Sequence, residues 1–241
     1  IDNQIVVYTK NGRLWAIGRN ETQNTPAGNF NNSVTTSPHN ILVIVANYTD
    51  VAPYNSTTIS QIQNMVFGNS NSLTGFYKEN SYNATNIDTG TVVGPFTIPY
   101  SHSQIEASAE DISPSSLVCT PSYINGSGQE IGLGKKILNV AQAAGVVTDG
   151  YSHVVIVTPI SNCSFAGVAF IGTPLVLPPT YQPSVMINGF DIARPEMLNI
   201  FTHEIGHTYG LPHAHALVCN PGTAHGSSSC NRNGTGYEYG D

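Results

Sequence analysis

One segment constrains this chain more than any other, because residues 203–213 read HEIGHTYGLPH. His203 and His207 are four positions apart, so on a helix both imidazole rings lie on one face and can bind one ion. Glu204 lies beside the first histidine, where its carboxylate can take a proton from a water molecule held there. The pattern therefore predicts a metal-binding helix that also carries a general base.

The metal-binding pattern continues beyond the expected end of that helix. Gly210 lets the backbone turn sharply through a left-handed conformation, and His213 then swings back as a third ligand. His215 is an alternative third ligand, but the spacing after Gly210 favours His213. Three histidines leave one position of a tetrahedral zinc ion open, so we predict one catalytic Zn²⁺. The remaining histidines are interpreted as ordinary polar or loop residues: His39, His102, His153 and His225.

Hydrophobic periodicity predicts strands and helices that alternate along the chain. Continuous apolar runs at 41–46 and 153–158 are typical of strands buried on both faces of a sheet. Shorter β-like segments are expected at 91–98 and 167–171, and the Pro-rich segment 174–183 is expected to lack regular structure. Helical spacing of apolar residues predicts helices at 58–67, 72–79, 129–144 and 195–209. This order indicates an α/β (α+β) fold with a small mixed twisted sheet, a backing helix and an active-site helix.

The first 38 residues differ from the rest of the chain. Short β-like runs at 5–8 and 14–17 are separated by Asn11-Gly12, which is a strong hairpin signal. Residues 18–38 are rich in Asn, Thr, Gly and Pro, as in a linker. We therefore expect an N-terminal hairpin and linker over residues 1–38 and one main domain over residues 39–241.

Composition narrows the classes of partner. Charged residues make up only 10% of the chain, against a usual ~25%. The net charge is -7 with 8 Lys plus Arg, and no basic cluster offers an electrostatic footprint for nucleic acid. No apolar run reaches the ~18 residues that a membrane-spanning helix needs. We therefore expect neither a nucleic-acid partner nor a membrane span.

The cysteines and the glycosylation sequons indicate an exported protein. Four cysteines allow three pairings, of which proximity favours Cys219 with Cys230, leaving Cys119 with Cys163. An Asn- and Thr-rich chain also produces sequons by chance, but the low charge agrees with attached sugar. We therefore expect a secreted, extracellular or cell-surface protein. The glycosylation candidates are Asn20, Asn31, Asn47, Asn55, Asn83, Asn125, Asn162 and Asn233.

These residues resemble a known group of enzymes. The eleven residues 203–213 match the extended metzincin motif, and other segments resemble the gametolysin (M11) family of metallopeptidases. The segments that carry this resemblance are ILVIVANYTD at 41–50, FYKENSY at 76–82, CSFAGVAFIG at 163–172 and YGD at 239–241. The resemblance implies a metzincin-like catalytic domain with His203, His207 and His213 as zinc ligands and Glu204 as general base.

The resemblance also implies a substrate-binding strand. This strand would border the cleft and pair with an extended polypeptide substrate, as an added strand pairs with the edge of a sheet. Its residues are Gly167, Val168, Ala169, Phe170 and Ile171.

Metzincins also have a Met-containing turn after the third histidine. All three methionines of this chain, Met65, Met186 and Met197, precede His213. The stretch YGD comes just before that turn in gametolysin-like proteins, and here it ends the sequence. We therefore expect the Met-turn region to be absent from this chain, or to belong to a separate C-terminal fragment.

Two functions are compatible with these features. The first is a secreted zinc-dependent endopeptidase that hydrolyses peptide bonds of extracellular proteins or glycoproteins. The alternative is a glycosylated extracellular surface, matrix or assembly module of metzincin ancestry, whose zinc site is structural or vestigial. The expected loss of the Met-turn and the many sequons favour the alternative. The intact Glu204 favours the enzyme, because a purely structural site needs no base.

Overall fold

The structure is a computed structural model, and it describes a defined part of the chain. The described residues are 6–10, 13–17, 39–83, 87, 89–106, 116–170, 183–209, 211, 218–219 and 230–231. The chain divides into two compact units, Ile1–Gly210 and Leu211–Asp241. The domain boundary predicted after residue 38 stays a prediction, because most of residues 1–38 lie outside the described part.

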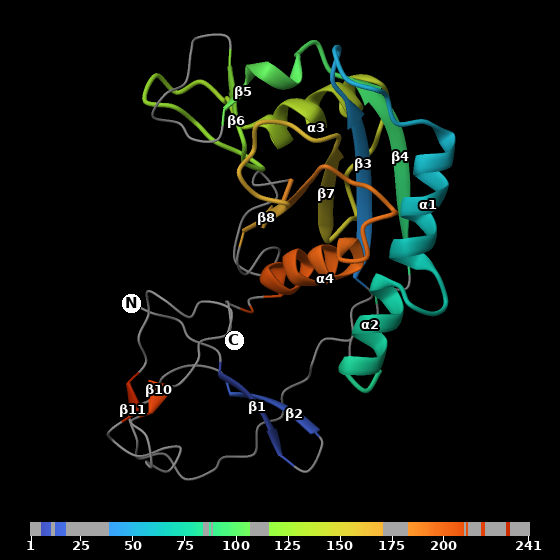
Figure 1. Cartoon of the computed structure of the whole chain (residues 1–241), viewed down its shortest axis with the longest axis vertical. Helices are drawn as coiled ribbons and strands as arrows, with labels where there is room; N and C mark the ends of the chain where they lie inside the picture. Colours follow the sequence, from blue (N-terminus) through green and yellow to red (C-terminus); the bar gives the residue numbers. More distant parts are fainter. Residues whose placement is uncertain are drawn as a thin grey trace. The chain divides into compact units, whose positions relative to one another are not determined.

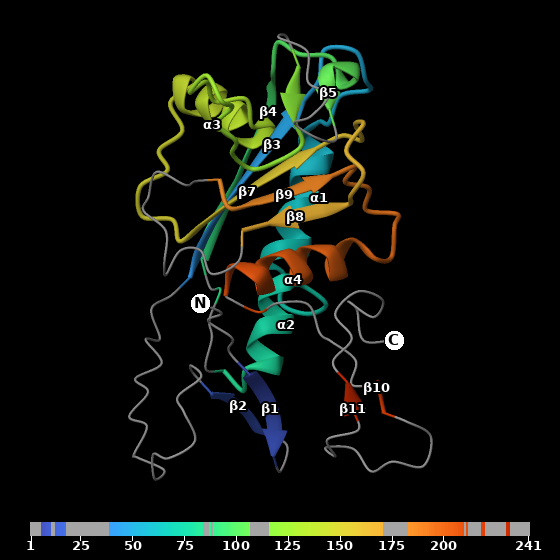
Figure 2. The ribbon, with the colours of Figure 1, turned by 90° about the vertical axis from the view of Figure 1, so that its left-hand side faces the viewer.

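The first unit is built on a mixed sheet, as the sequence predicts, and this sheet has five strands. Its strands are β3 (Asn40–Asn47), β4 (Thr89–Thr97), β7 (His153–Thr158), β8 (Gly167–Ala169) and β9 (Val185–Asn188). They are arranged in the order β4-β3-β7-β9-β8 (Figures 1 and 2). The first four strands are parallel, whereas β8 is antiparallel to β9. Strand β8 therefore forms one edge of the sheet.

Strand β9 was not predicted, although it determines where β8 lies. It contains only four residues and directly follows the Pro-rich segment, so its apolar run is too short to show a period. Most of that segment, 174–182, lies outside the described residues. The predicted strand at 167–171 is shorter in the structure, where β8 spans Gly167–Ala169 and residue 171 is not described.

Four helices accompany the sheet: α1 (Ser56–Phe67), α2 (Leu73–Asn80), α3 (Leu133–Ala143) and α4 (Met197–Thr208). Asn55 caps the N-terminus of α1, and its side-chain oxygen accepts hydrogen bonds from the backbone of Thr57 and Thr58. The prediction for 129–144 placed the start of α3 too early. Glu130 and Gly132 instead form β-bridges with Ile124 and Val118, which removes this stretch from the helix.

The remaining elements are short. A 3₁₀ turn, η1 (His102–Gln104), leads into β5 (Ile105–Glu106), which pairs in parallel with β6 (Leu117–Val118). The predicted N-terminal hairpin appears as β1 (Val6–Lys10) paired antiparallel with β2 (Arg13–Ile17). In the described part of the chain, no helix has the length and apolar character needed to cross a membrane.

Hydrophobic cores cover both faces of the sheet. Alternate residues of β3 point to opposite faces, so Ile41 and Val43 pack in one core and Leu42 and Ile44 in the other. The first core contains residues of α1, α2 and α4, and the second contains residues of α3. Figures 1 and 2 show α1 and α3 on opposite faces of the sheet. This two-sided burial explains why β3 and β7 have continuous apolar runs.

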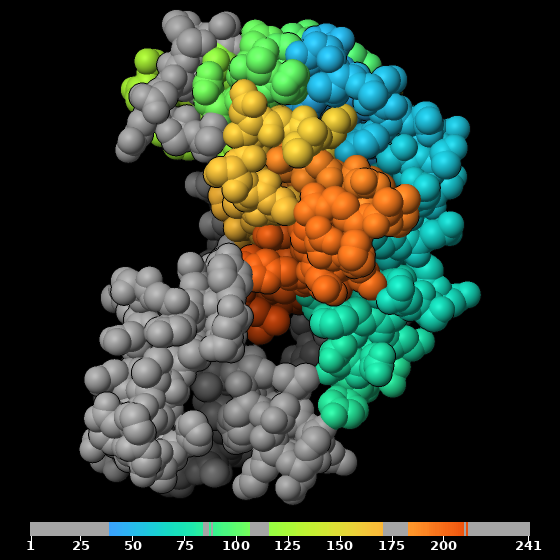
Figure 3. Space-filling model, in the orientation of Figure 1, coloured from blue at the N-terminus to red at the C-terminus, as the bar shows by residue number. Residues whose placement is uncertain are grey.

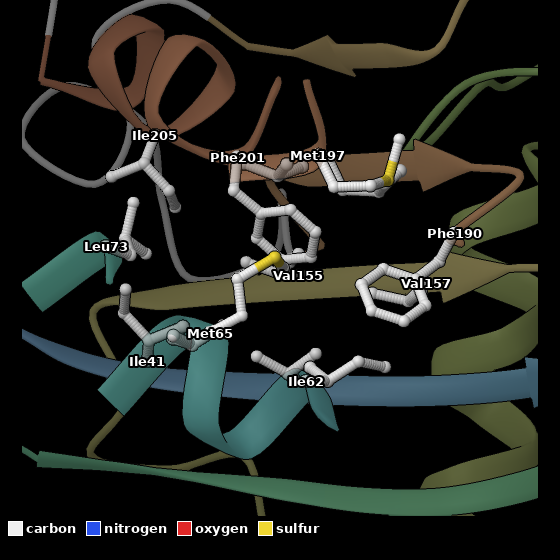
Figure 4. Close-up of a cluster of buried hydrophobic side chains, with 14 of the residues drawn as sticks. Ile41, Ile62, Met65, Leu73, Val155, Val157, Phe190, Met197, Phe201 and Ile205 are labelled. Atoms are coloured by element: carbon white, nitrogen blue, oxygen red, sulfur yellow. The ribbon is translucent and has the colours of Figure 1, made fainter. Parts of the chain in front are cut away.

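Helix α4 is anchored in the first core by its apolar side chains. Met197, Phe201 and Ile205 recur every four residues and are buried together with Met65 of α1 and Val155 of β7 (Figure 4). Burial of each such side chain contributes about 1.5–3 kcal/mol, so this stripe holds the helix firmly against the sheet. The polar residues of α4 thereby take defined positions beside β8.

One disulfide joins two loops of the first unit. Cys119 and Cys163 are bonded across a sequence separation of 44 residues, in agreement with the pairing inferred from the sequence. In the second unit, β10 (Val218–Cys219) pairs antiparallel with β11 (Cys230–Asn231), and Cys219 lies opposite Cys230 in the ladder. This backbone register is compatible with a Cys219–Cys230 bond, which stays a prediction.

Candidate metal and catalytic site

Two histidine side chains of α4 converge on one point. The Nε2 atoms of His203 and His207 are 3.0 Å apart, and the centroids of their rings are 4.5 Å apart. Two nitrogen atoms that bind one zinc ion at ~2.0–2.1 Å are separated by about this distance. The pair therefore fits two of the three expected zinc ligands. The fit follows from the four-residue spacing, which places both side chains on one face of the helix.

Glu204, which follows His203 in the sequence of α4, is buried. Its side chain belongs to the interior, with only 6% of the residue exposed. Burial disfavours the charged form of a carboxylic acid, and it raises the pKa of Glu204 to about 7. A carboxyl group with a pKa near neutrality can both accept and return a proton at neutral pH. Glu204 therefore has the ionisation behaviour expected of a general base.

Strand β8 approaches Glu204 so closely that only glycine fits. A Cβ atom built on Gly167 would lie 2.6 Å from Cγ and 2.7 Å from Oε1 of Glu204. Contacts of that length are far inside van der Waals distance, so any larger residue would displace the carboxylate. The first residue of β8 thus forms one wall of the position that Glu204 occupies. Figure 3 shows the surface of the segment that contains β8 bordering that of residues 183–209.

The outer edge of β8 offers backbone hydrogen-bonding groups. Bonds from Asn188 N to Ala166 O and from Phe170 N to Ser184 O pair β8 with β9 through its even-numbered residues. In an antiparallel ladder the alternate residues direct their N–H and C=O groups the other way. The backbone groups of Gly167 and Ala169 therefore point to the outer edge of the sheet, on the strand that contacts helix α4.

Comparison with protein families identifies the chain. The family described as Reprolysin_5, metallo-peptidase family M12, matches residues 35–237. The chain belongs to metallo-peptidase family M12. This match confirms the metzincin type, whereas the gametolysin-like (M11) family remains a resemblance of individual segments. Comparison with curated proteins finds no match.

The third ligand of this M12 chain stays a prediction. Gly210, His213 and the alternative ligand His215 all lie outside the described residues. Among the residues that the structure does describe, no group of three His, Cys, Asp or Glu side chains is placed to hold a metal ion. The structure therefore brings together the ring nitrogens of His203 and His207, with Glu204 next to His203 in the sequence of α4. A third ligand after Tyr209 stays a prediction.

This M12 chain also contains a buried polar residue that was not identified from the sequence as structurally important. His153 was interpreted as an ordinary polar residue, but it is fully buried and its Nδ1 lies 3.0 Å from Oγ1 of Thr208. Tyr77 of α2 was not singled out either, yet its hydroxyl donates a 2.6 Å hydrogen bond to the carbonyl of Thr202. The sequence held one signal for His153, because it begins an apolar run that was predicted to be buried on both faces.

The structure separates the glycosylation candidates of the M12 chain by exposure. Asn47 is buried, and its Nδ2 donates a hydrogen bond to the carbonyl of Tyr54. Asn55, Asn83 and Asn162 are exposed, and Asn125 is half-buried. The remaining candidates lie outside the described residues: Asn20, Asn31 and Asn233.

Proposed function

We propose that this chain is a secreted zinc-dependent endopeptidase that cleaves extracellular proteins or glycoproteins. One observation carries the proposal: two facing histidine nitrogens lie on the same helix as a buried carboxyl group. A structural metal site would need the histidines but not the buried acid. Membership of the M12 family supports the same reaction class.

The zinc ion would be held by His203, His207 and His213. The first two fit one ion by the distance between their Nε2 atoms, and His213 is proposed from its spacing in the sequence. When bound, the ion supplies Lewis-acid chemistry, which polarises the scissile carbonyl and makes water acidic enough to react near neutral pH.

Glu204 moves the proton in the proposed reaction. Its carboxylate accepts a proton from the attacking water and then gives that proton to the nitrogen of the leaving amine. Both transfers need a carboxyl group whose pKa is near the working pH, and burial raises the pKa of Glu204 to about 7. Gly167 leaves room for the carboxylate in its present position, because it has no side chain that would displace it.

The substrate is proposed to be an extended polypeptide that pairs with the outer edge of β8. The backbone groups of Gly167 and Ala169 supply donors and acceptors for such pairing, independently of the substrate's side chains. Strand β8 also contacts the residue that would act as the base, so a bound peptide would run past Glu204. Phe170 and Ile171 remain proposed substrate contacts from the resemblance alone.

Export from the cell is part of the proposal. The Cys119–Cys163 disulfide supports it, because such bonds persist in oxidising compartments outside the cytosol. The exposed sequons at Asn55, Asn83 and Asn162 are consistent with attached sugar.

Substitution of Glu204 tests the proposed function. Glu204→Gln should keep zinc content unchanged and lower the cleavage rate of an unfolded polypeptide such as casein by about 10²–10⁴-fold, which is the usual contribution of a general base. Glu79→Gln is a matched control, because it makes the same chemical change on the exposed side of α2. Cleavage by Glu204→Gln at the wild-type rate would contradict the assignment. Zinc binding without cleavage by the wild-type chain would favour the non-enzymatic module instead.

A further inference from the structure

A group of four residues lies at the end of α4 and outside the proposed catalytic chemistry. We call it the helix-end cluster: His39, His153, Thr208 and Tyr209. Nε2 of His153 is 3.3 Å from Nδ1 of His39, and Nδ1 of His153 is 3.0 Å from Oγ1 of Thr208. The ring of Tyr209 packs edge-on against His39, with centroids 4.8 Å apart, and lies 5.4 Å from His153.

The hydrogen bonds of the helix-end cluster agree on one arrangement of protons. The Thr208 hydroxyl donates to the carbonyl of Ile205 at 2.7 Å, so its oxygen accepts from His153. His153 is then a neutral imidazole with its proton on Nδ1, and its Nε2 accepts from Nδ1 of His39. His153 thereby connects the start of β3 and β7 to the last turn of α4.

Thr208 links the helix-end cluster to the proposed metal ligands. Thr208 is the last residue of α4 and directly follows His207, and the chain continues from it through Gly210 to His213. Any shift of this turn moves both His207 and the point from which the third ligand must reach the metal. We propose that His153 is a positioning residue for the metal site, holding the last turn of α4 through its hydrogen bond to Thr208. The effect of this positioning on zinc binding rests on the proposed function.

The same geometry makes the end of α4 sensitive to pH. The residues that face His153 are His39, next to β3, and Thr208 and Tyr209 of the α4 end. Burial, with a smaller effect of His39, lowers the pKa of His153 to about 3. Opening that exposes His153 returns its pKa to about 6.5, so opening becomes more favourable as the pH falls below 6.5. At pH 5.0 protonation of His153 by itself favours opening by about 30-fold.

Hydrogen exchange of the full-length, metal-free protein tests the positioning role without relying on zinc. We expect the protection factors of the amides at 205–209 in the wild type, relative to those in His153→Asn, to fall about 30-fold between pH 7.5 and 5.0. His153→Asn keeps an N–H donor near the position of Nδ1 but does not titrate, so the two proteins should be equally protected at pH 7.5. The contribution of the buried Glu204, which titrates in both proteins, cancels in this comparison. A ratio of protection factors that does not change with pH would overturn the proposal.

Variants of Thr208 test the hydrogen bond itself at pH 7.5. Thr208→Val removes the acceptor at constant shape and should lower protection at 205–209 by up to about tenfold, whereas Thr208→Ser should restore it. Thr202→Val is the matched control, because the Thr202 hydroxyl likewise donates to a carbonyl three residues earlier, that of Asn199, whereas the hydroxyl of Thr208 also bonds to His153. Equal loss in Thr202→Val and Thr208→Val would overturn the specific role of His153.

Zinc competition with a chelator at pH 7.5 then tests the consequence for the metal site. Thr208→Val should bind zinc several-fold more weakly than Thr202→Val, and Thr208→Ser should bind as the wild type does. If the wild type shows the expected exchange pattern but binds no zinc, the positioning of the helix end stands and the proposed function fails. If zinc binds normally while the exchange pattern is absent, only the positioning role fails.

Discussion

At the scale of single residues, the contact between Gly167 and Glu204 restricts the choice of amino acid at position 167. The two residues come from different elements, strand β8 and helix α4, and they meet without room for a methyl group. Glycine is needed here for close approach, since no positive φ is recorded for Gly167. A substitution at this position therefore acts on the carboxylate directly.

We expect Gly167→Ala to lower kcat by about 10- to 100-fold, because a displacement of about 1 Å at a catalytic group costs this much. KM should change much less, since the backbone groups of β8 remain. Gly126→Ala is the control, because a Cβ at Gly126 would meet nothing within 4 Å. Steady-state kinetics of both variants check the prediction, and a selective rise in KM would instead assign Gly167 to substrate binding.

At the scale of elements, the position of α4 depends on its neighbours as well as on its own sequence. Its apolar stripe packs into the core formed by α1, α2 and the sheet (Figure 4). Tyr77 of α2 adds a hydrogen bond, because its buried hydroxyl donates to the carbonyl of Thr202, one residue before His203. Helix α2 thus helps to fix the helix that carries the histidine pair.

Removal of the Tyr77 hydrogen bond should lower the stability of the fold measurably. We expect Tyr77→Phe to lower the free energy of unfolding by about 1 kcal/mol, which is the usual net value of one hydrogen bond. In a domain of this size the melting temperature should fall by roughly 2–4 °C. Tyr123→Phe, at an exposed position, is the control and should leave thermal unfolding unchanged. A Tyr77→Phe protein as stable as the wild type would show that packing alone holds α2 against α4.

At the scale of the whole molecule, the Cys119–Cys163 disulfide closes a long loop that contains α3 and β7. Loop closure of this length stabilises the fold by about 4 kcal/mol in the chain-entropy description. We expect the double variant Cys119→Ala, Cys163→Ala to lose about that much in urea unfolding. Reduction of the wild type with a thiol should give a similar loss, and an effect below about 1 kcal/mol would contradict this estimate.

Glycosylation provides a second whole-molecule prediction. If the chain is expressed through a eukaryotic secretory pathway, peptide mapping should find sugar at the exposed Asn83 and Asn162. Asn47 should be unmodified, because its Nδ2, the atom that would carry sugar, is buried and bonded to the Tyr54 carbonyl. Modification of Asn47 would show that sugar is attached before β3 is packed.

Much of the fold could be predicted because several elements have strong local signals. The runs at 41–46 and 153–158 predicted β3 and β7 from continuous burial, and helical spacing predicted all four helices to within a few residues. The sequence misplaced one element and missed another. Helix α3 starts later than predicted because Glu130 and Gly132 pair with other segments, and β9 is too short for its pattern to be visible.

The sequence by itself determined that His203, Glu204 and His207 lie within one helix, with the two histidines on the same face. Their relative positions follow from helix geometry alone, so the pairing of the two histidine nitrogens needed no tertiary information. Tertiary structure decided everything that joins different elements. Packing of β8 against α4 buries Glu204 and raises its pKa, and the sheet brings His153 to Thr208 across 55 residues of sequence. Such contacts depend on which elements pack together, and no local pattern encodes that choice.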